Sequence, residues 1–196
     1  VISNQQIPEK IRIDFYNTVK AEVDNQIKLT PKDARIYIIA GSFFNSIRDF
    51  KSATPLLEKA NELSPNKQSI IYELASNYLS IGKDKEAVEL MAQAYNSSTD
   101  NDIAKAGYIS TLITTKQDDL ANKLFGSDQA IFTDPKIVNA YMYTKQYDKA
   151  IEIYKSMIKK DPETQETYSA LAYAYILNGQ NTLAIATLRT AEDKFP

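Results

Sequence analysis

The composition of this 196-residue chain excludes several kinds of function. Cysteine and histidine are both absent, which removes disulfides, thiol chemistry, zinc fingers and histidine-based catalysis. The formal net charge is −2 and the Lys and Arg residues are spread along the chain, so we expect no binding of nucleic acid or of an anionic membrane surface. No apolar run approaches the length of about 18 residues that would indicate insertion into a bilayer.

The first predicted element is a long helix from Pro8 to about Leu29, because proline suits a first helical turn. Its apolar residues step by four along one face: Ile7, Ile11, Phe15, Val19, Val23 and Ile27. A lone helix with such a stripe must lie against something. We therefore predict that residues 1–30 form a cap of the domain or the second helix of an upstream hairpin.

Residues 31–64 predict a helical hairpin. The first helix carries Tyr37, Ala40, Gly41 and Phe44 on one face, and the second carries Ala53, Leu57 and Ala60. Pro55 falls inside the second helix, where it removes a backbone hydrogen bond. Two interpretations stay open: the helix begins late with Ser52 as its cap, or it is kinked at the proline.

The same pattern returns about 34 residues later, in residues 65–98. Its packed positions are Ile71, Leu74, Ala75 and Tyr78, then a turn at Gly82–Lys83, then Ala87, Met91 and Ala94. Two apolar stripes separated by a short turn can bury each other only as an antiparallel pair.

The next two units are shortened. Residues 99–126 keep Tyr108, Ile109 and Leu112, although Lys105 replaces the leading apolar residue, and the second helix is predicted to stop near Gly126. An irregular connection follows, with Ile131 and Phe132 expected to point inward. Asp134–Pro135 then opens a short helix in residues 134–162, by the preference for an N-cap followed by proline. Its packed residues are Ile137, Val138 and Tyr141, and the partner helix carries Tyr147, Ala150, Tyr154 and Met157.

Residues 163–196 repeat the regular pattern, with Tyr168, Leu171, Ala172 and Tyr175, a turn at Gly179, and then Ala184, Leu188 and Ala191. Pro65, Pro162 and Pro196 each close one unit. Since no polar capping helix follows the last unit, Ile185 or Leu188 should be partly uncovered. Either the native chain continues or another molecule covers this end.

These residues, read in order, resemble the tetratricopeptide repeat: large apolar, Leu or Ala, Gly or Ala, aromatic, Gly, Ala, large apolar, Ala and Pro. The resemblance implies an all-α, right-handed solenoid of about five helical hairpins preceded by one long helix. It also implies a non-catalytic module that binds a protein or peptide partner, because tandem hairpins line a concave face with their first helices.

The concave positions lie between the packed ones and form the predicted peptide-binding groove: Arg35, Ile38, Ser42, Asn45, Tyr72, Ser76, Leu79, Ser110, Asn139, Tyr143, Tyr173 and Ile176. The third hairpin also offers Ala106 and Ile113. Such a mixture of aromatic, aliphatic and hydroxyl side chains suits an apolar peptide segment. The alternative interpretation is that these residues only pack the solenoid. A clamp for a C-terminal carboxylate is not expected, since Ile38, Ser42 and Ser76 replace the basic and Asn residues that such family members use.

The chain offers no pattern for catalysis, metal binding or a cofactor. Asp100 and Asp102 lie at a helix start, where carboxylates satisfy free amides, and they lack the Gly and distal Glu of a calcium loop. The five glycines form no phosphate-binding loop. We therefore predict no catalytic residues, no metal and no cofactor.

A narrower resemblance concerns the parent protein. The runs Lys28–Ser46, Asn61–Leu79 and Asp134–Pro162 are similar to the C-terminal repeat domains of bacterial O-antigen ligase-like membrane proteins. That resemblance implies an extracytoplasmic appendage of a glycan-transferring enzyme; without it, a cytoplasmic location is expected. A structural spacer, or a self-association module that uses the exposed C-terminal end, is the alternative to peptide binding.

Overall fold

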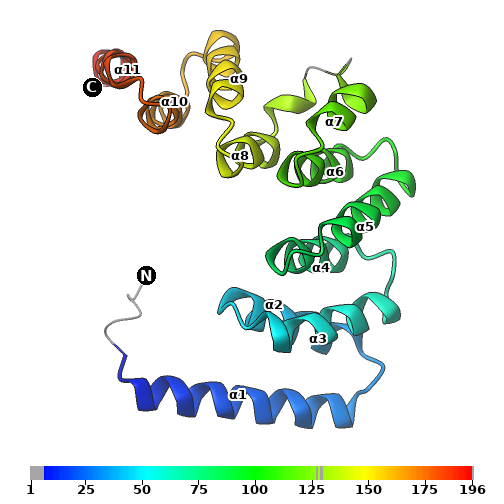
Figure 1. Cartoon of the computed structure of the whole chain (residues 1–196). Coiled ribbons are helices and arrows are strands. Elements are labelled where there is room, and N and C mark those ends of the chain that lie inside the picture. The colour runs from blue at the N-terminus through cyan, green and yellow to red at the C-terminus, as the bar shows by residue number, and fades with distance from the viewer. Residues whose placement is uncertain (1–6, 127, 129, 196) are drawn as a thin grey trace. The chain divides into compact units, whose positions relative to one another are not determined.

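The computed structural model describes residues 7–126, 128 and 130–195, and these residues contain α-helices and one short 3₁₀ turn but no strand. The chain divides into two compact units, residues 1–87 and 88–196, and α5 contains the boundary between them (Figure 1). The predicted all-α helical-repeat class is confirmed. The predictions for Pro196 and for the first six residues lie outside the described part of the chain.

The helices are α1 (Glu9–Leu29), α2 (Ala34–Ser46), α3 (Phe50–Leu63), α4 (Gln68–Ser80), α5 (Asp84–Asn96), α6 (Asp102–Thr114), α7 (Asp118–Phe125), η1 (Ile131–Thr133), α8 (Pro135–Tyr143), α9 (Tyr147–Lys160), α10 (Gln165–Leu177) and α11 (Asn181–Lys194).

In the first unit, α2 lies against both α3 and α4. Leu57 of α3 is fully buried and faces Gly41 of α2; a Cβ atom built on Gly41 would lie 2.6 Å from the Leu57 side chain. Tyr37, Ala60 and Ile70 form a buried cluster that joins all three helices. The small residue on α2 thus permits a close approach of α2 and α3, which form the hairpin that the sequence pattern predicted.

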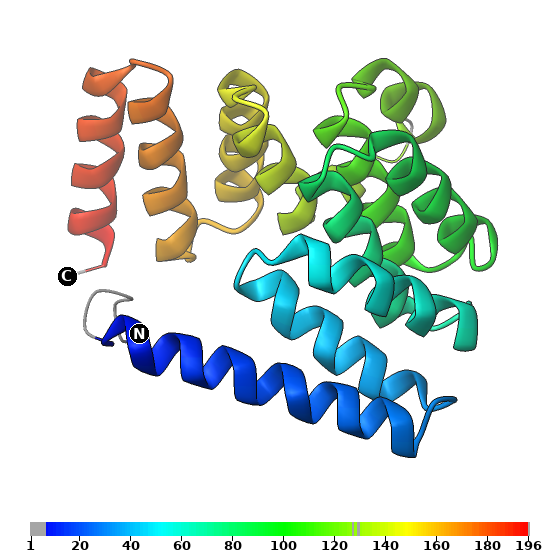
Figure 2. The same ribbon diagram turned by 60° about the horizontal axis from the view of Figure 1, so that its bottom comes forward.

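The long helix α1 runs alongside α2 in both ribbon views (Figures 1 and 2) and has no fully buried residue. The Phe15 ring meets Phe43 edge to face at 6.2 Å, and the Tyr16 hydroxyl donates a 2.6 Å hydrogen bond to Asp49. Ile27 packs against the cluster formed by Tyr37, Ala60 and Ile70. The apolar stripe of α1 is therefore only partly covered by α2.

In the second unit, α6, α8 and α10 form one row of helices, and α7, α9 and α11 form a second row (Figure 1). The largest buried cluster joins α6, α7, η1, α8 and α9 around Ile109, Leu112 and Ile137. A second cluster joins α9, α10 and α11, and Met142 of α8 packs against it. The apolar faces predicted from the helical period are those that build these clusters.

All five helix pairs turn in the same way. In each turn an amide after the first helix donates to a carbonyl five residues earlier, as in Gln146 to Tyr141 at 2.9 Å and Lys83 to Tyr78 at 2.8 Å. The residue before that amide has a positive φ: 76° at Gly82 and 75° at Gly179, and also 63° at Arg48, 60° at Lys116 and 61° at Lys145. This is the Schellman ending of a helix, here with glycine in only two of its five copies.

The shortened region follows the sequence prediction closely. Helix α7 ends at Phe125, and η1 buries Ile131 against the core while Phe132 packs beside it. Asp134 caps α8 by accepting a hydrogen bond from the Lys136 amide at 2.8 Å, with Pro135 in the first turn.

The structure explains why Lys105 replaces the leading apolar residue of the repeat pattern in α6. Its Nζ lies 2.8 Å from Oδ2 of Asp128 in the irregular connection. This hydrogen bond, together with the charge of Asp128, raises the pKa of Lys105, although burial opposes the shift.

The structure decides the question of Pro55. Helix α3 begins at Phe50, and its N-cap is Asp49, whose side chain accepts from the Ser52 amide at 3.2 Å. A late start capped by Ser52 is therefore wrong. Pro55 lies within the helix, in its second turn, where it forgoes one backbone hydrogen bond.

Candidate peptide-binding site

The predicted groove residues of the first unit are largely engaged with one another. Asn77 of α4 is fully buried; its amide donates to Asn45 of α2 at 2.8 Å, and its carbonyl oxygen accepts from Thr54 of α3 at 2.8 Å. The Asn45 amide also lies 3.4 Å from the carboxylate of Glu73. Because buried polar groups need partners, this network holds three helices together and occupies the groups of Asn45 that could have met a peptide.

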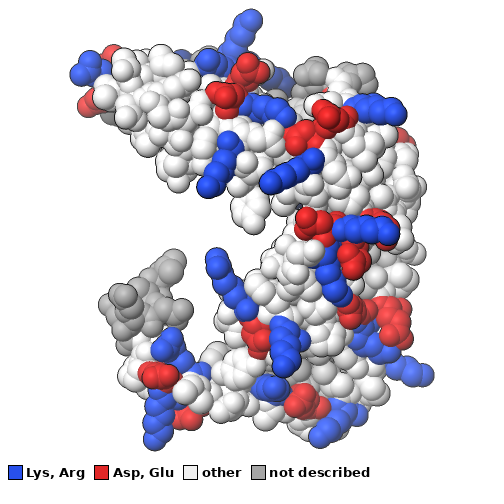
Figure 3. Space-filling model, in the orientation of Figure 1, with Lys and Arg blue, Asp and Glu red and all other residues white. Residues whose placement is uncertain are grey.

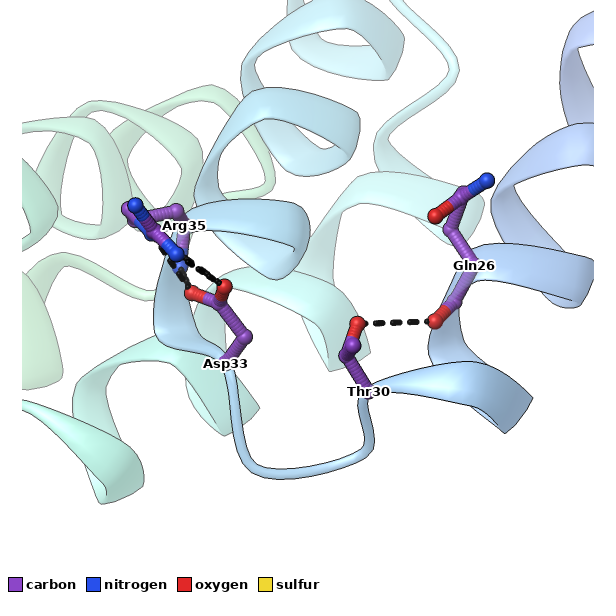
Figure 4. Close-up of polar contacts among 4 residues, drawn as sticks. All are labelled: Gln26, Thr30, Asp33 and Arg35. Carbon is purple, nitrogen blue, oxygen red and sulfur yellow. Dashed lines mark hydrogen bonds and ion pairs between the residues drawn. The ribbon is translucent and has the colours of Figure 1, made fainter.

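Arg35 is exposed, but its guanidinium is turned toward the cap of its own helix (Figure 4). Nε donates to Asp33 Oδ1 at 3.0 Å and Nη2 to Oδ2 at 2.6 Å. The Arg35 side chain and amide lower the pKa of Asp33 from 3.8 to about 2. Ile38 is half-buried against the cluster around Tyr37, and Ser42 is also half-buried.

On α4 the three predicted residues differ in exposure: Ser76 is exposed, while Tyr72 and Leu79 are half-buried. The Tyr72 hydroxyl oxygen is buried and has no hydrogen-bond partner in the described part of the chain. Burial raises the pKa of Tyr72. The aromatic body of Tyr72 therefore serves mainly in packing.

The predicted residues of α8 and α10 in the second unit are open. On α8, Tyr143 is 77% exposed and Asn139, four residues earlier, is also exposed. On α10, Tyr173 is 57% exposed and Ile176 is 50% exposed. These helices lie in the same row, and Met142 of α8 packs against the cluster that contains Ala174 of α10 (Figure 1). We call Asn139, Tyr143, Tyr173 and Ile176 the α8–α10 surface.

Helix α6 contributes less than the sequence suggested. Ser110 is half-buried and donates to the Gly107 carbonyl at 2.9 Å. Ala106 and Ile113 are fully buried, so their assignment to the concave face is wrong. The reason is the shortened third hairpin, which brings η1 and α8 against α6 and covers it on an additional side.

A hollow of about 330 Å³ that the sequence did not reveal lies between η1, α8 and α9, beside the short α7. Its cation, Lys149, is held by Asp118 at 2.9 Å and lies 5.2 Å from the centre of the Tyr141 ring. Burial, with the charge of Asp118 adding to it, raises the pKa of Tyr141. The only sequence signal for this hollow is the missing last turn of α7.

Charge does not single out a further site. Lys and Arg are interspersed with Asp and Glu on the face of each unit shown in Figure 3. The described residues contain no cluster of three potential metal ligands. No described helix has the length and apolarity that a membrane-spanning helix requires.

The fold is of the helical-hairpin repeat class, and comparison with known proteins agrees with it. Residues 141–196 match the tetratricopeptide repeat family. A tetratricopeptide repeat protein from Parabacteroides merdae has the same fold, with a TM-score of 0.63 and 16% identity over 93% of this chain and 75% of that one. The family match covers residues 141–196 only, and the likeness to the Parabacteroides merdae structure shows a common helical-repeat fold. Stacked helical repeats of this kind form extended concave surfaces that can bind partners.

Two further solved structures are similar at lower scores. YrrB, described as a tetratricopeptide repeat protein with an unusual peptide-binding site, has a TM-score of 0.47 and 19% identity, covering 89% of this chain and 92% of its own. MamA from Desulfovibrio magneticus has a TM-score of 0.49 and 16% identity, covering 82% of this chain and 93% of its own. No curated protein sequence matches this chain.

Proposed function

We propose that this chain is a non-catalytic interaction module that binds an extended peptide segment of a partner protein, with the α8–α10 surface as the main contact. The observation that carries the proposal is the exposure of Tyr143, Tyr173 and Ile176 on the row of first helices. Aromatic side chains present large rigid contact areas and are enriched where peptides bind.

The experiment is a selection of short random peptides against the full chain, followed by measured affinities. Ile176→Ala should weaken binding of a selected peptide about tenfold, as expected for an apolar hot-spot residue. Ile185→Ala on α11 is a matched control, because Ile185 is 53% exposed and has the same side chain. Failure to select any peptide, or equal losses in the two variants, would contradict the proposal.

A second candidate function is self-association through the last helix. Leu183, Ile185 and Leu188 of α11 are all more than 40% exposed, in agreement with the predicted uncovered end. Ile185 and Leu188 are three residues apart and therefore share one face of α11, and contiguous exposed apolar residues are typical of association surfaces. Light scattering over a range of protein concentrations tests self-association. A dimer that Ile185→Ala disrupts would support this function, and a monomer at every concentration would contradict it.

The finer proposal for the parent protein is an O-antigen ligase-like membrane protein whose extracytoplasmic tail this chain would form. It rests on the sequence resemblance of Lys28–Ser46, Asn61–Leu79 and Asp134–Pro162 alone. Transmembrane segments encoded upstream of Val1 would support it, and a soluble domain encoded there would contradict it.

A further inference from the structure

The hollow of about 330 Å³ between η1, α8 and α9 contains a hydroxyl group without a hydrogen-bond partner. Tyr141 of α8 lines this hollow and is only 3% exposed, and its hydroxyl forms no hydrogen bond in the described part of the chain. Nearly all buried polar side chains have such a partner. The Tyr72 hydroxyl is also unpaired but is closed off from solvent, whereas the Tyr141 hydroxyl borders a hollow that a ligand can enter.

Lys149 of α9 adds further hydrogen-bond donors to the hollow. Its Nζ donates to Oδ1 of Asp118 at 2.9 Å, and a lysine ammonium carries three N–H groups, so two of them remain for a ligand. Asp118 already balances the charge of Lys149, and its other oxygen accepts from Gln146 at 3.3 Å. The inner part of the hollow therefore offers donors without an unbalanced positive charge.

Most acceptors of the hollow lie nearer to solvent. Glu152 is exposed, follows Lys149 by about one turn on α9, and forms no ion pair with any described residue. The Thr133 hydroxyl donates to the Ala130 carbonyl at 2.8 Å, so only its lone pairs remain for a ligand. Asn122, exposed on α7, can both donate and accept. A ligand in the hollow therefore meets donors at its inner end and acceptors toward solvent.

Two apolar side chains complete the hollow. Phe132 of η1 and Ile153 of α9 are half-buried and pack against the core cluster around Ile109. The face of an aromatic ring carries a partial negative charge that attracts polarised C–H groups. Ligand pockets combine such apolar surface with a few placed polar groups, in volumes of about 300–1,000 Å³. The hollow lies at the small end of this range and suits a ligand with one ring.

We propose that this hollow binds a neutral cyclic polyol, of which a monosaccharide is the simplest example. Six of the eight residues that line it are polar, and they include both donors and acceptors. A ligand hydroxyl both donates and accepts, so several hydroxyls on one ring would satisfy Tyr141, Lys149 and Glu152 together. The C–H face of the same ring would pack on Phe132.

Charge and the number of polar groups disfavour other ligands. An anion would approach Asp118 and Glu152, and the one cation in the lining, Lys149, is already neutralised. A cation would lie beside Lys149. A carboxamide side chain of a partner protein is neutral but has one donor group and one acceptor, so most of the polar lining would stay unpaired.

The hollow is separate from the α8–α10 surface. Tyr141 and Tyr143 are two residues apart on α8, and residues at this spacing do not share a helix face. The first is buried beside the hollow and the second is exposed. Polyol binding therefore goes beyond the proposed function and does not depend on it.

The test is an NMR titration of the nitrogen-15-labelled full chain with glucose, galactose and mannose. At least one of these sugars should shift the amide signals of residues 133, 141 and 149 in a saturable way at millimolar concentration. The corresponding uronate, which carries a carboxylate, should bind about fivefold more weakly or worse, because Asp118 and Glu152 repel it. No saturable shift from any of the three sugars at tens of millimolar overturns the proposal.

Matched substitutions in the chain locate the binding. Tyr141→Phe removes only the hydroxyl; it should weaken the sugar about fivefold through the loss of one hydrogen bond and leave the urea midpoint unchanged. Tyr154→Phe is the control, because burial also raises the pKa of Tyr154 but this residue does not line the hollow. Equal affinity of the two variants for the sugar overturns the proposal. A loss of stability in Tyr141→Phe also overturns it, since the hydroxyl would then already be paired.

Two other results would assign the hollow to a charged ligand, and each overturns the proposal. Tighter binding of the uronate than of the neutral sugar would indicate an anion site. Tighter binding of glucosamine than of glucose in mildly acidic buffer, lost in Glu152→Gln, would indicate a cation site. None of these results bears on peptide selection, so failure here is distinguishable from failure of the proposed function.

Discussion

Helices α2 and α4 of the first unit and α8 and α10 of the second have corresponding places in their hairpins but present different surfaces. In the first pair, Asn45 of α2 forms hydrogen bonds with Asn77 and Glu73 of α4, so these side chains are engaged within the unit. The second pair leaves Tyr143 and Tyr173 exposed. The same repeat position can therefore stabilise the stack or remain available for a partner, and the type of side chain alone does not tell which.

The difference has a physical basis in the neighbouring helix. In the first unit, polar residues on α4 lie opposite Asn45, so a buried network is satisfied at every member. In the second unit, Met142 of α8 packs against an apolar cluster that includes Ala174 of α10, and the longer side chains of Tyr143 and Tyr173, next to these residues in sequence, remain in solvent. Changes at the two surfaces should accordingly affect different properties.

The largest expected effect on stability is at the first surface. Asn77→Leu removes two hydrogen bonds and leaves Asn45 and Thr54 facing an apolar side chain. We expect a loss of about 2 kcal/mol in the free energy of unfolding, from buried groups left unsatisfied. Urea denaturation measures it, and an unchanged midpoint would show that the network contributes nothing.

The next largest effect on stability should be of the same size in both units, because each unit contains turns of this type. Lys145→Gly and Arg48→Gly each replace a side chain at positive φ. Relief of the left-handed conformation, less the entropy that glycine adds to the unfolded chain, should stabilise the protein by about 0.5–1 kcal/mol. Gly82→Ala should act in the opposite direction, and a gain of stability in that variant would refute the role of the turn.

At the second surface, Tyr143→Ala should change the free energy of unfolding by less than about 0.5 kcal/mol, since the ring is exposed and forms no described ring contact. Thermal denaturation of this variant and of Asn77→Leu compares the contributions of the two surfaces to the free energy of unfolding. If the loss in Tyr143→Ala equals that in Asn77→Leu, the exposed residue is structural and the contrast between the units disappears.

The smallest effect concerns Arg35. Arg35→Ala should raise the pKa of Asp33 from about 2 toward 3.8, because the guanidinium no longer stabilises the carboxylate. A carboxyl with a lowered pKa in the folded state contributes stability above its unfolded value and loses it as the pH falls from about 3.8 to 2. Carbon-13 NMR of the carboxyl groups follows the shift, and an unmoved Asp33 would mean that the pair is absent in solution.

Much of the fold could be predicted because it depends on local patterns. The helical period, the cap and proline of α8 and the early end of α7 are all visible in the sequence. The turns at Arg48, Lys116 and Lys145 were not visible, since no glycine marks their positive φ. There the packing of two helices imposes a backbone conformation that local preference opposes.

The candidate site could be predicted only as a set of positions. Periodicity assigned Asn45 and Tyr143 to the same row but could not reveal that Asn77, 32 residues away, accounts for the hydrogen bonds of Asn45. The burial of Ala106 and Ile113 depends on η1, an irregular segment without a period. Exposure is a long-range property, and it separates positions that the repeat pattern makes equivalent.

The most direct test of the peptide-binding account is cross-linking from single positions. A photoreactive phenylalanine analogue introduced at residue 143 or 173, and at residue 185 as the control, is irradiated with a selected peptide and the adducts are identified by mass spectrometry. The account predicts peptide adducts from positions 143 and 173 and none from 185. Adducts confined to 185, or no adduct from 143 and 173 at saturating peptide, would contradict it.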